Sequence, residues 1–153
     1  MKGFILLTLV PFIIGLFVYC KAENQVSQQN TDFMNGNKIK IKADDKTFTA
    51  TLLDNPTAKA FKAHLPLTIK MNELNNNEKY ADLPKSVPTN SSVPASIQSG
   101  DLMMYGSRTL VLFYKGFSTS YSYTKIGKID DTTGLVAALG SGDVTVRFEL
   151  EKD

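Results

Sequence analysis

The sequence predicts a mainly β protein, a closed barrel of short strands with two short capping helices. Runs of alternating apolar and polar residues recur from Lys38 to Leu150, as in half-buried strands. Only residues 55–65 and 133–140 combine helical spacing with capping residues. Many short strands with few helices are typical of a barrel closed on itself and plugged at its ends.

The first elements are a hairpin and a helix. Residues 38–43 and 48–52 alternate around a tight turn at Asp44-Asp45, and Lys38, Lys40 and Lys42 are expected on the solvated face of the first strand. Asn55 is a suitable N-cap and Pro56 suits the first helical turn, while Pro66 ends the helix. We expect Phe61, on the apolar face of this helix, to plug one end of the barrel.

The later elements follow the same patterns. Residues 67–71 alternate, residues 72–80 are too polar for a core element, and residues 84–96, with three prolines, predict a long exposed loop. Residues 110–114 form an unbroken apolar run, which indicates a strand buried on both faces. Thr133 is expected to cap a helix that Gly140 ends in a left-handed conformation, with Leu135 and Leu139 plugging the second end of the barrel. A strand over residues 144–150 completes the chain.

The N-terminus predicts export. Residues 1–20 hold one lysine and then an apolar run that ends at Cys20, so they are expected to be an export signal or lipoprotein leader. Cys20 lies where bacterial lipoproteins carry their lipid, although Tyr19 stands where a small residue is expected. Cleavage after Ala22 would give a periplasmic or secreted soluble protein, and about 17 apolar residues are also at the short limit for a membrane span.

Composition limits the domain organisation, the partners and the disulfide bonds that the chain can have. Residues 21–37 are predicted to be a flexible tether and residues 38–153 the single barrel domain. The formal charge of +2 argues against nucleic acid as a partner, because phosphate binding needs a basic face. Cys20 is the only cysteine, so no internal disulfide can form and the core alone must stabilise the fold. A monomer is expected that meets the membrane only through the N-terminal lipid.

Several segments resemble proteins of known fold. Residues 48–61, in which a strand runs into a helix carrying a phenylalanine, are similar to a segment of the cyclophilins. Residues 110–114 correspond to their Gln-Phe-Phe strand, and Ile126-Gly-Lys-Ile129 to their Phe-Gly-Lys-Val strand. The chain more closely resembles the small bacterial cyclophilin-like proteins, on residues 71–80, 100–106 and 117–124. This resemblance implies a cyclophilin-like barrel related to the prolyl isomerases.

The catalytic residues of those isomerases are missing. The resemblance implies that an arginine in a Phe-His-Arg strand assists the twisting prolyl amide, but the corresponding strand here reads Leu67-Thr-Ile-Lys-Met71. Arg108 and Arg147 are the only arginines, the glutamine of Gln-Phe-Phe is replaced, and Lys70 lacks the planar fork of a guanidinium. No catalytic residue or cofactor is therefore expected.

Glu73 and Glu78, with the asparagines of residues 72–77, offer oxygen ligands for a cation, but such runs are usually solvated loops. A catalytic or zinc role of His64, the only histidine, would need partners that the sequence does not supply. No metal ligand is expected.

The function predicted from the sequence is an exported binding module for an extended peptide or a small ligand. The alternative is an active peptidyl-prolyl cis-trans isomerase of the cell envelope. Aromatic side chains among serines and threonines suit ligand contact, although a half-buried strand gives the same alternation. Phe113 fits either the floor of a pocket or the barrel core. The candidate ligand-binding residues are Glu73, Tyr105, Phe113, Thr119, Tyr121 and Tyr123.

Overall fold

Eight antiparallel strands close into a barrel in the order β1-β2-β7-β5-β6-β4-β3-β8, which confirms the predicted fold class. The structure is a computed structural model that describes residues 36–152. The strands are β1 (Lys38–Ala43), β2 (Lys46–Leu52), β3 (Leu67–Leu74), β4 (Glu78–Asp82), β5 (Asp101–Tyr105), β6 (Thr109–Phe113), β7 (Thr124–Ile129) and β8 (Val144–Leu150).

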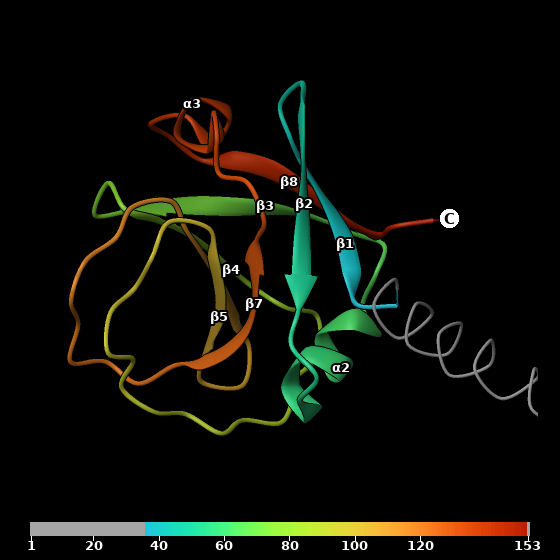
Figure 1. Cartoon of the computed structure of the whole chain (residues 1–153), viewed down its shortest axis with the longest axis vertical. Coiled ribbons are helices and arrows are strands. Elements are labelled where there is room, and N and C mark those ends of the chain that lie inside the picture. Colours follow the sequence, from blue (N-terminus) through green and yellow to red (C-terminus); the bar gives the residue numbers. More distant parts are fainter. Residues whose placement is uncertain (1–35, 153) are drawn as a thin grey trace, which may run out of the picture. The chain divides into compact units, whose positions relative to one another are not determined.

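Two short helices, α2 (Pro56–Lys62) and α3 (Leu135–Leu139), lie at opposite ends of the barrel (Figure 1). Phe61 on α2 is fully buried and meets Phe148 of β8 edge to face, with ring centroids 5.8 Å apart. Leu135 and Leu139 of α3 are buried in the same core. The residues predicted to plug the barrel therefore do lie in its core.

The caps of the two helices differ. Asn55 caps α2 as predicted, since its side chain accepts a hydrogen bond of 2.8 Å from the amide of Ala58. The prediction for α3 was wrong, because its N-cap is Gly134 rather than Thr133, with φ 80° and no side-chain hydrogen bond. Gly140 does have a positive φ of 64°, but its ψ of −174° is extended.

The first hairpin agrees with its predicted pattern. Ile39 and Ile41 are fully buried, and β1 pairs with β2 through a turn in which Asp44 has a positive φ of 54°. Lys38 and Lys40 lie on the opposite face and make ion pairs at the surface. The basic row is thus the solvated side of a half-buried strand.

Residues 72–80 form a hairpin within the barrel wall, so the prediction that they were too polar for a core element was wrong. β3 and β4 pair through residues 72–74 and 78–80. Asn75 and Asn76 both have positive φ, which is what the tight turns of hairpins require. Lys79 of β4 is fully buried.

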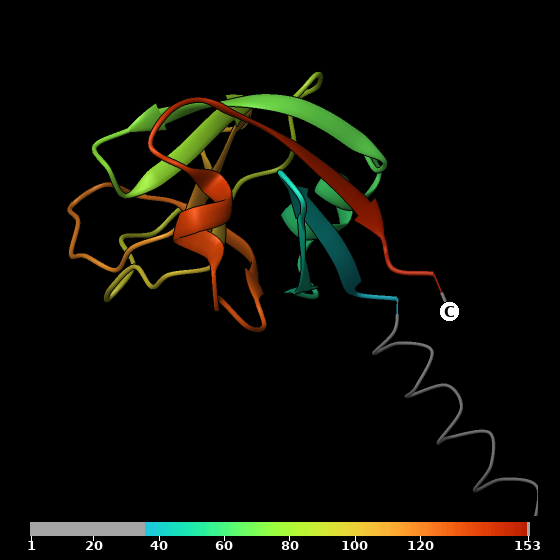
Figure 2. The ribbon, with the colours of Figure 1, turned by 90° about the horizontal axis from the view of Figure 1, so that it is seen from above.

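Two long loops cover one side of the barrel. Residues 84–96 contain no strand, as predicted, and lie beside residues 114–123, as both views show (Figures 1 and 2). Isolated β-bridges join Ser92 to Tyr123 and Ile97 to Phe117. The loops therefore form a layer over the outer face of β4, β5 and β6.

The predicted leader, with Cys20, and most of the predicted tether lie outside the described residues. Within residues 36–152, neither helix has the length and the apolar composition that a membrane-spanning helix needs.

Candidate functional site

A pocket of about 670 Å³ opens on the outer face of β4, β5 and β6, beneath the loop of residues 117–123. Strand alternation explains this position, because successive side chains point to opposite faces of a strand. Ala81 and Leu110 point inward to the main core. Val111 and Phe113 belong instead to a second, smaller apolar cluster, against which Tyr80 packs on the outer face.

The pocket is lined by aromatic and hydroxyl side chains, with one charge. Its volume lies in the range typical of sites for small molecules. Among its lining residues only Glu78 is charged. The lining residues are Leu74, Asn75, Glu78, Tyr80, Tyr105, Thr109, Val111, Phe117, Ser118, Thr119, Ser120, Tyr121 and Tyr123.

Three tyrosines make non-parallel walls. The rings of Tyr105 and Tyr121 are perpendicular, with centroids 6.2 Å apart. Tyr123 is tilted by 54° to Tyr105 at 5.7 Å. Tyr123 is buried, whereas Tyr105 and Tyr121 are 49% and 62% exposed and stand at the rim. The pocket is therefore aromatic from its floor to its mouth.

Four of the residues predicted to bind a ligand come together here: Tyr105, Thr119, Tyr121 and Tyr123. Thr119 is held in a local turn, since its hydroxyl oxygen accepts a 3.1 Å hydrogen bond from the amide of Tyr121. The O–H of Thr119 is left to donate.

Phe113 lies beneath the pocket and does not line it. The side chain is fully buried in the second cluster. Its ring contacts Phe117 at 5.6 Å and Tyr123 edge to face at 5.5 Å, and both of these partners do line the pocket. Phe113 thus supports the floor of the pocket from below.

Glu78 brings a carboxylate to the pocket wall. It stands on β4 opposite Phe113 and is only 7% exposed. Burial raises the pKa of Glu78, and the charge of Glu73 raises it further. Within residues 36–152 no lysine, arginine or histidine forms an ion pair with Glu78.

Tyr123, the buried tyrosine of the pocket, also has a raised pKa. Burial raises the pKa of Tyr123 to about 12, with a further contribution from the charge of Glu78 and from Tyr105 and Tyr121. Tyr123 is therefore a neutral hydroxyl at physiological pH. It can donate a hydrogen bond but is a poor base.

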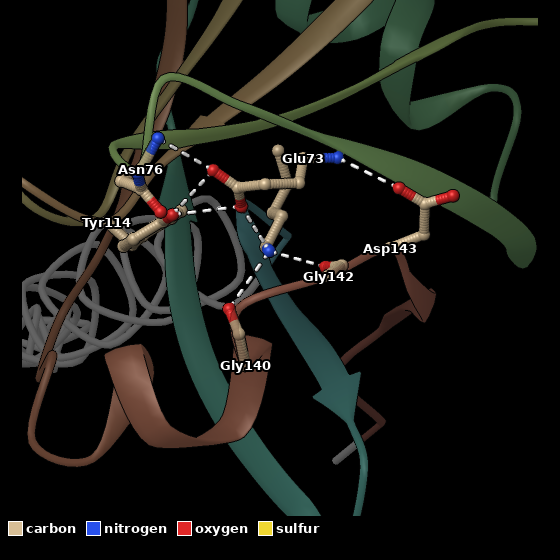
Figure 3. Close-up of polar contacts among 7 residues, drawn as sticks. Glu73, Asn76, Tyr114, Gly140, Gly142 and Asp143 are labelled. Carbon is tan, nitrogen blue, oxygen red and sulfur yellow. Dashed lines mark hydrogen bonds and ion pairs between the residues drawn. The ribbon is translucent and has the colours of Figure 1, made fainter.

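Glu73, the remaining candidate, points away from the pocket. Lys79, its cross-strand partner, donates to the Glu73 carboxylate and to the carbonyl oxygens of Gly140 and Gly142, at 3.0 Å and 2.6 Å (Figure 3). The hydroxyl of Tyr114 donates to Glu73 at 2.9 Å. The strand neighbour, Leu74, takes the position in the pocket.

The polar groups of Glu73, Lys79 and Tyr114 satisfy one another and do not line the pocket. Burial alone would raise the pKa of Glu73, but hydrogen bonds from Lys79 and Tyr114 outweigh it and hold the pKa below its ordinary value. Burial and the same carboxylate raise the pKa of Tyr114 to about 12. All three protons of the Lys79 ammonium have partners, so the network fastens β4 to the loop between α3 and β8.

Sequence reasoning missed Lys79 and Tyr114 and treated Glu78 only as part of a weak oxygen cluster. A signal was present, since three asparagines between alternating residues are typical of a hairpin turn. Extending the alternation of residues 67–71 across that turn would have placed Glu78 and Lys79 on opposite faces of a strand. Their partners are distant in sequence, however, and no local pattern identifies them.

The basic residues considered for catalysis lie elsewhere. Lys70 is 69% exposed and pairs with Asp143 at 3.1 Å. Arg108 donates to the carbonyl of Leu83, and Arg147 pairs with Glu149. His64 contacts the carbonyl of Ala60 through Nδ1 at 2.9 Å, near the C-terminus of α2. None of these four side chains lines the pocket.

Within residues 36–152 no three histidine, cysteine, aspartate or glutamate side chains are grouped closely enough to hold a metal ion. Glu73 and Glu78, considered as oxygen ligands, point to opposite faces of the hairpin, because Glu73 pairs with Lys79 across it.

Comparisons with known proteins agree with this architecture. No curated protein matches the sequence significantly. The structure is similar to the solution structure of the hypothetical protein AF2241 from Archaeoglobus fulgidus, with a TM-score of 0.52 and 17% identity over 76% of this chain and 95% of that one. At that identity the likeness shows the fold alone. The model of the Cyclophilin-like family matches residues 41–149, and the chain therefore belongs to the cyclophilin-like family.

Proposed function

We propose that this domain is a binding module that takes a small molecule or a peptide side chain into the pocket on the outer face of β4, β5 and β6, without prolyl isomerase activity. The observation that carries the proposal is the lining of the pocket. Tyrosines and hydroxyls surround it, whereas Lys70, Arg108 and Arg147 all lie elsewhere.

The geometry suits binding better than catalysis of isomerisation. The barrier to rotation about a peptide bond is about 20 kcal/mol, and lowering it requires a donor aimed at the twisting amide. The side-chain donors in the pocket are all neutral, with no guanidinium or ammonium among them. Its only charged side chain is the carboxylate of Glu78, which cannot donate a hydrogen bond when it is ionised. Rigid aromatic walls, in contrast, offer contact area at a low cost in conformational entropy.

We further propose that the protein is exported and held at the membrane by lipid on Cys20. The apolar run that ends at this cysteine supports the proposal. A binding domain joined to a lipid by a polar tether would meet ligands outside the cytoplasm.

Binding is tested by NMR titration of the purified protein with capped tripeptides, acetyl-Gly-X-Gly-amide, where X is in turn acidic, basic, aliphatic, aromatic and proline. We expect at least one peptide to shift the amide resonances of Thr119, Tyr121 and Tyr123. Tyr121→Ser should remove the response, while Val136→Ser, at an exposed position on α3, should retain it. The absence of any response across the whole series would overturn the proposal.

Isomerisation is tested with a protease-coupled assay on a short X–Pro peptide. We expect the uncatalysed rate, with a time constant of tens of seconds, for the wild type and for Lys70→Ala alike. A rate constant within two decades of an ordinary cyclophilin would favour the alternative, an active isomerase.

A further inference from the structure

Glu78 is the only charged side chain that lines the pocket in the described part of the chain. Glu78 is only 7% exposed. Within residues 36–152 its carboxylate accepts no hydrogen bond from a side chain and makes no ion pair. Burial raises the pKa of this carboxyl, and the charge of Glu73, which repels it, raises the pKa further. Burying a carboxylate without a partner opposes folding, so a site that retains one calls for a group that neutralises it.

Asp101 and the partly buried Glu73 show how this fold treats a carboxylate that needs no ligand. Asp101, fully buried, has Lys125 Nζ at 2.8 Å from its Oδ1. Glu73 has Lys79 and the hydroxyl of Tyr114. Glu78 stands next to Lys79 in the sequence, but strand alternation turns the two side chains to opposite faces. The carboxylate in the pocket is thus left without the cation that its neighbours receive.

The aromatic walls suit a positive charge as well. The faces of aromatic rings carry negative potential and attract ammonium and guanidinium groups, most strongly where water is excluded. Tyr105, Tyr121 and Tyr123 present rings in planes that are 54° and 90° apart at one end of the pocket. The carboxylate of Glu78 and the three rings line the same pocket.

We infer that the pocket recognises an organic cation, an ammonium or guanidinium group that pairs with Glu78 and lies against the tyrosine rings. This inference rests on the binding function proposed above and names its ligand class. An anionic ligand would meet a carboxylate with no cation in the lining, and a neutral apolar ligand would leave Glu78 buried and unpaired. The hydroxyls of Ser118, Thr119 and Ser120 at the loop remain for the rest of the ligand.

The cation has two possible sources, a free small amine and a basic side chain of a peptide, and two matched pairs of probes separate them. Choline and its neutral isostere 3,3-dimethylbutan-1-ol test the free amine. Acetyl-Gly-Lys-Gly-amide and its norleucine analogue test the peptide. Each is titrated into the purified protein, with dissociation constants taken from the amide shifts of residues 117–123.

We expect at least one cation to bind tenfold or more tightly than its neutral partner, because a desolvated charge pair and ring contacts act together. Glu78→Gln should remove that preference while the neutral probe binds as before. Glu151→Gln, which removes an equal charge from the outer surface beyond β8, should leave the preference intact and serves as the matched control. Tyr105→Leu should weaken binding of the cation, and Tyr105→Phe should preserve that binding.

The outcomes separate this inference from the binding function. Neutral probes that bind as tightly as cations, or a preference unchanged in Glu78→Gln, would overturn the cation inference and leave a binding pocket. If none of the four probes bound, the cation inference would fail. The binding function would fail with it only if the wider tripeptide series were silent too.

Discussion

Lys79 and Glu73 face each other across β3 and β4, and the ammonium of Lys79 is completely removed from solvent. The pair is one contact of a set that also includes two carbonyls more than 60 residues away along the chain, those of Gly140 and Gly142. Removing one partner of a buried ion pair leaves the other charge uncompensated, which costs more than the pair itself contributes.

We therefore predict that Lys79→Met lowers the free energy of unfolding by about 3 kcal/mol. The substitution keeps the length of the side chain but removes all three hydrogen bonds of the ammonium. Urea denaturation of the purified variant measures the loss. Lys70→Met, which removes an exposed ion pair from the neighbouring strand, should cost no more than about 0.5 kcal/mol. Equal losses in the two variants would contradict the structural role of Lys79.

Phe61 gives a prediction for the core. The side chain is fully buried and packs edge to face on Phe148, so Phe61→Ala should cost about 3–5 kcal/mol. Val136→Ala on the other helix, at a position that is 51% exposed, is the control and should cost less than about 1 kcal/mol. Thermal or denaturant unfolding compares the two. A loss below about 1 kcal/mol for Phe61→Ala would show that α2 does not plug the barrel.

Glu78 should make the protein less stable as the pH rises. Its folded pKa is raised above the ordinary 4.5, so the folded state holds this proton to a higher pH than the unfolded state. The stability that the neutral carboxyl contributes is fully present below pH 4.5 and is lost as the pH rises through the pKa of the folded state. Glu78→Gln should escape this loss and be more stable than the wild type at pH 8.

The difference between the two proteins should shrink at pH 4, where Glu78 is neutral when folded. Urea denaturation at both pH values measures it. The comparison measures the contribution of Glu78 together with its coupling to Glu73, and Glu151→Gln controls for net charge. A Glu78→Gln variant less stable than the wild type at pH 8 would show that the carboxylate serves the fold.

The export proposal predicts a mature protein that begins at Cys20 and carries lipid there. Mass spectrometry of protein from the membrane fraction should show the loss of residues 1–19 and the added mass of acyl chains. Cys20→Ser should abolish the modification. A mature N-terminus at Glu23 would refute the lipid anchor, and an intact N-terminus would refute cleavage.

The fold could be predicted because its signals are local. Asn55 and Pro56 begin α2 where capping rules place its start, and Ile39 and Ile41 are buried as alternation predicts. The hairpin of β3 and β4 was missed because polarity was taken as a sign of exposure. Lys79 is polar and yet buried, since its partners come from a loop that no local pattern connects to it.

The candidate site could be predicted only in part, for a similar reason. Tyr105, Tyr121 and Tyr123 stood out by composition and do line the pocket. Glu73 and Glu78 have the same side chain and lie five residues apart, so composition cannot tell them apart. Which of them lies in the pocket depends on the face of the sheet to which each points, and the three-residue turn between their strands sets that face.

The succession of Glu78 and Lys79 has a consequence for the charge of the site. A shift of one residue in the register of a strand moves every side chain to the other face. In β4 such a shift would bring an ammonium into the tyrosine pocket and leave a carboxylate facing the carbonyls of Gly140 and Gly142. The contacts of Lys79 exclude that arrangement, since only a donor satisfies those oxygens. An interior ion pair thereby fixes the sign of the charge that the pocket presents to its ligand.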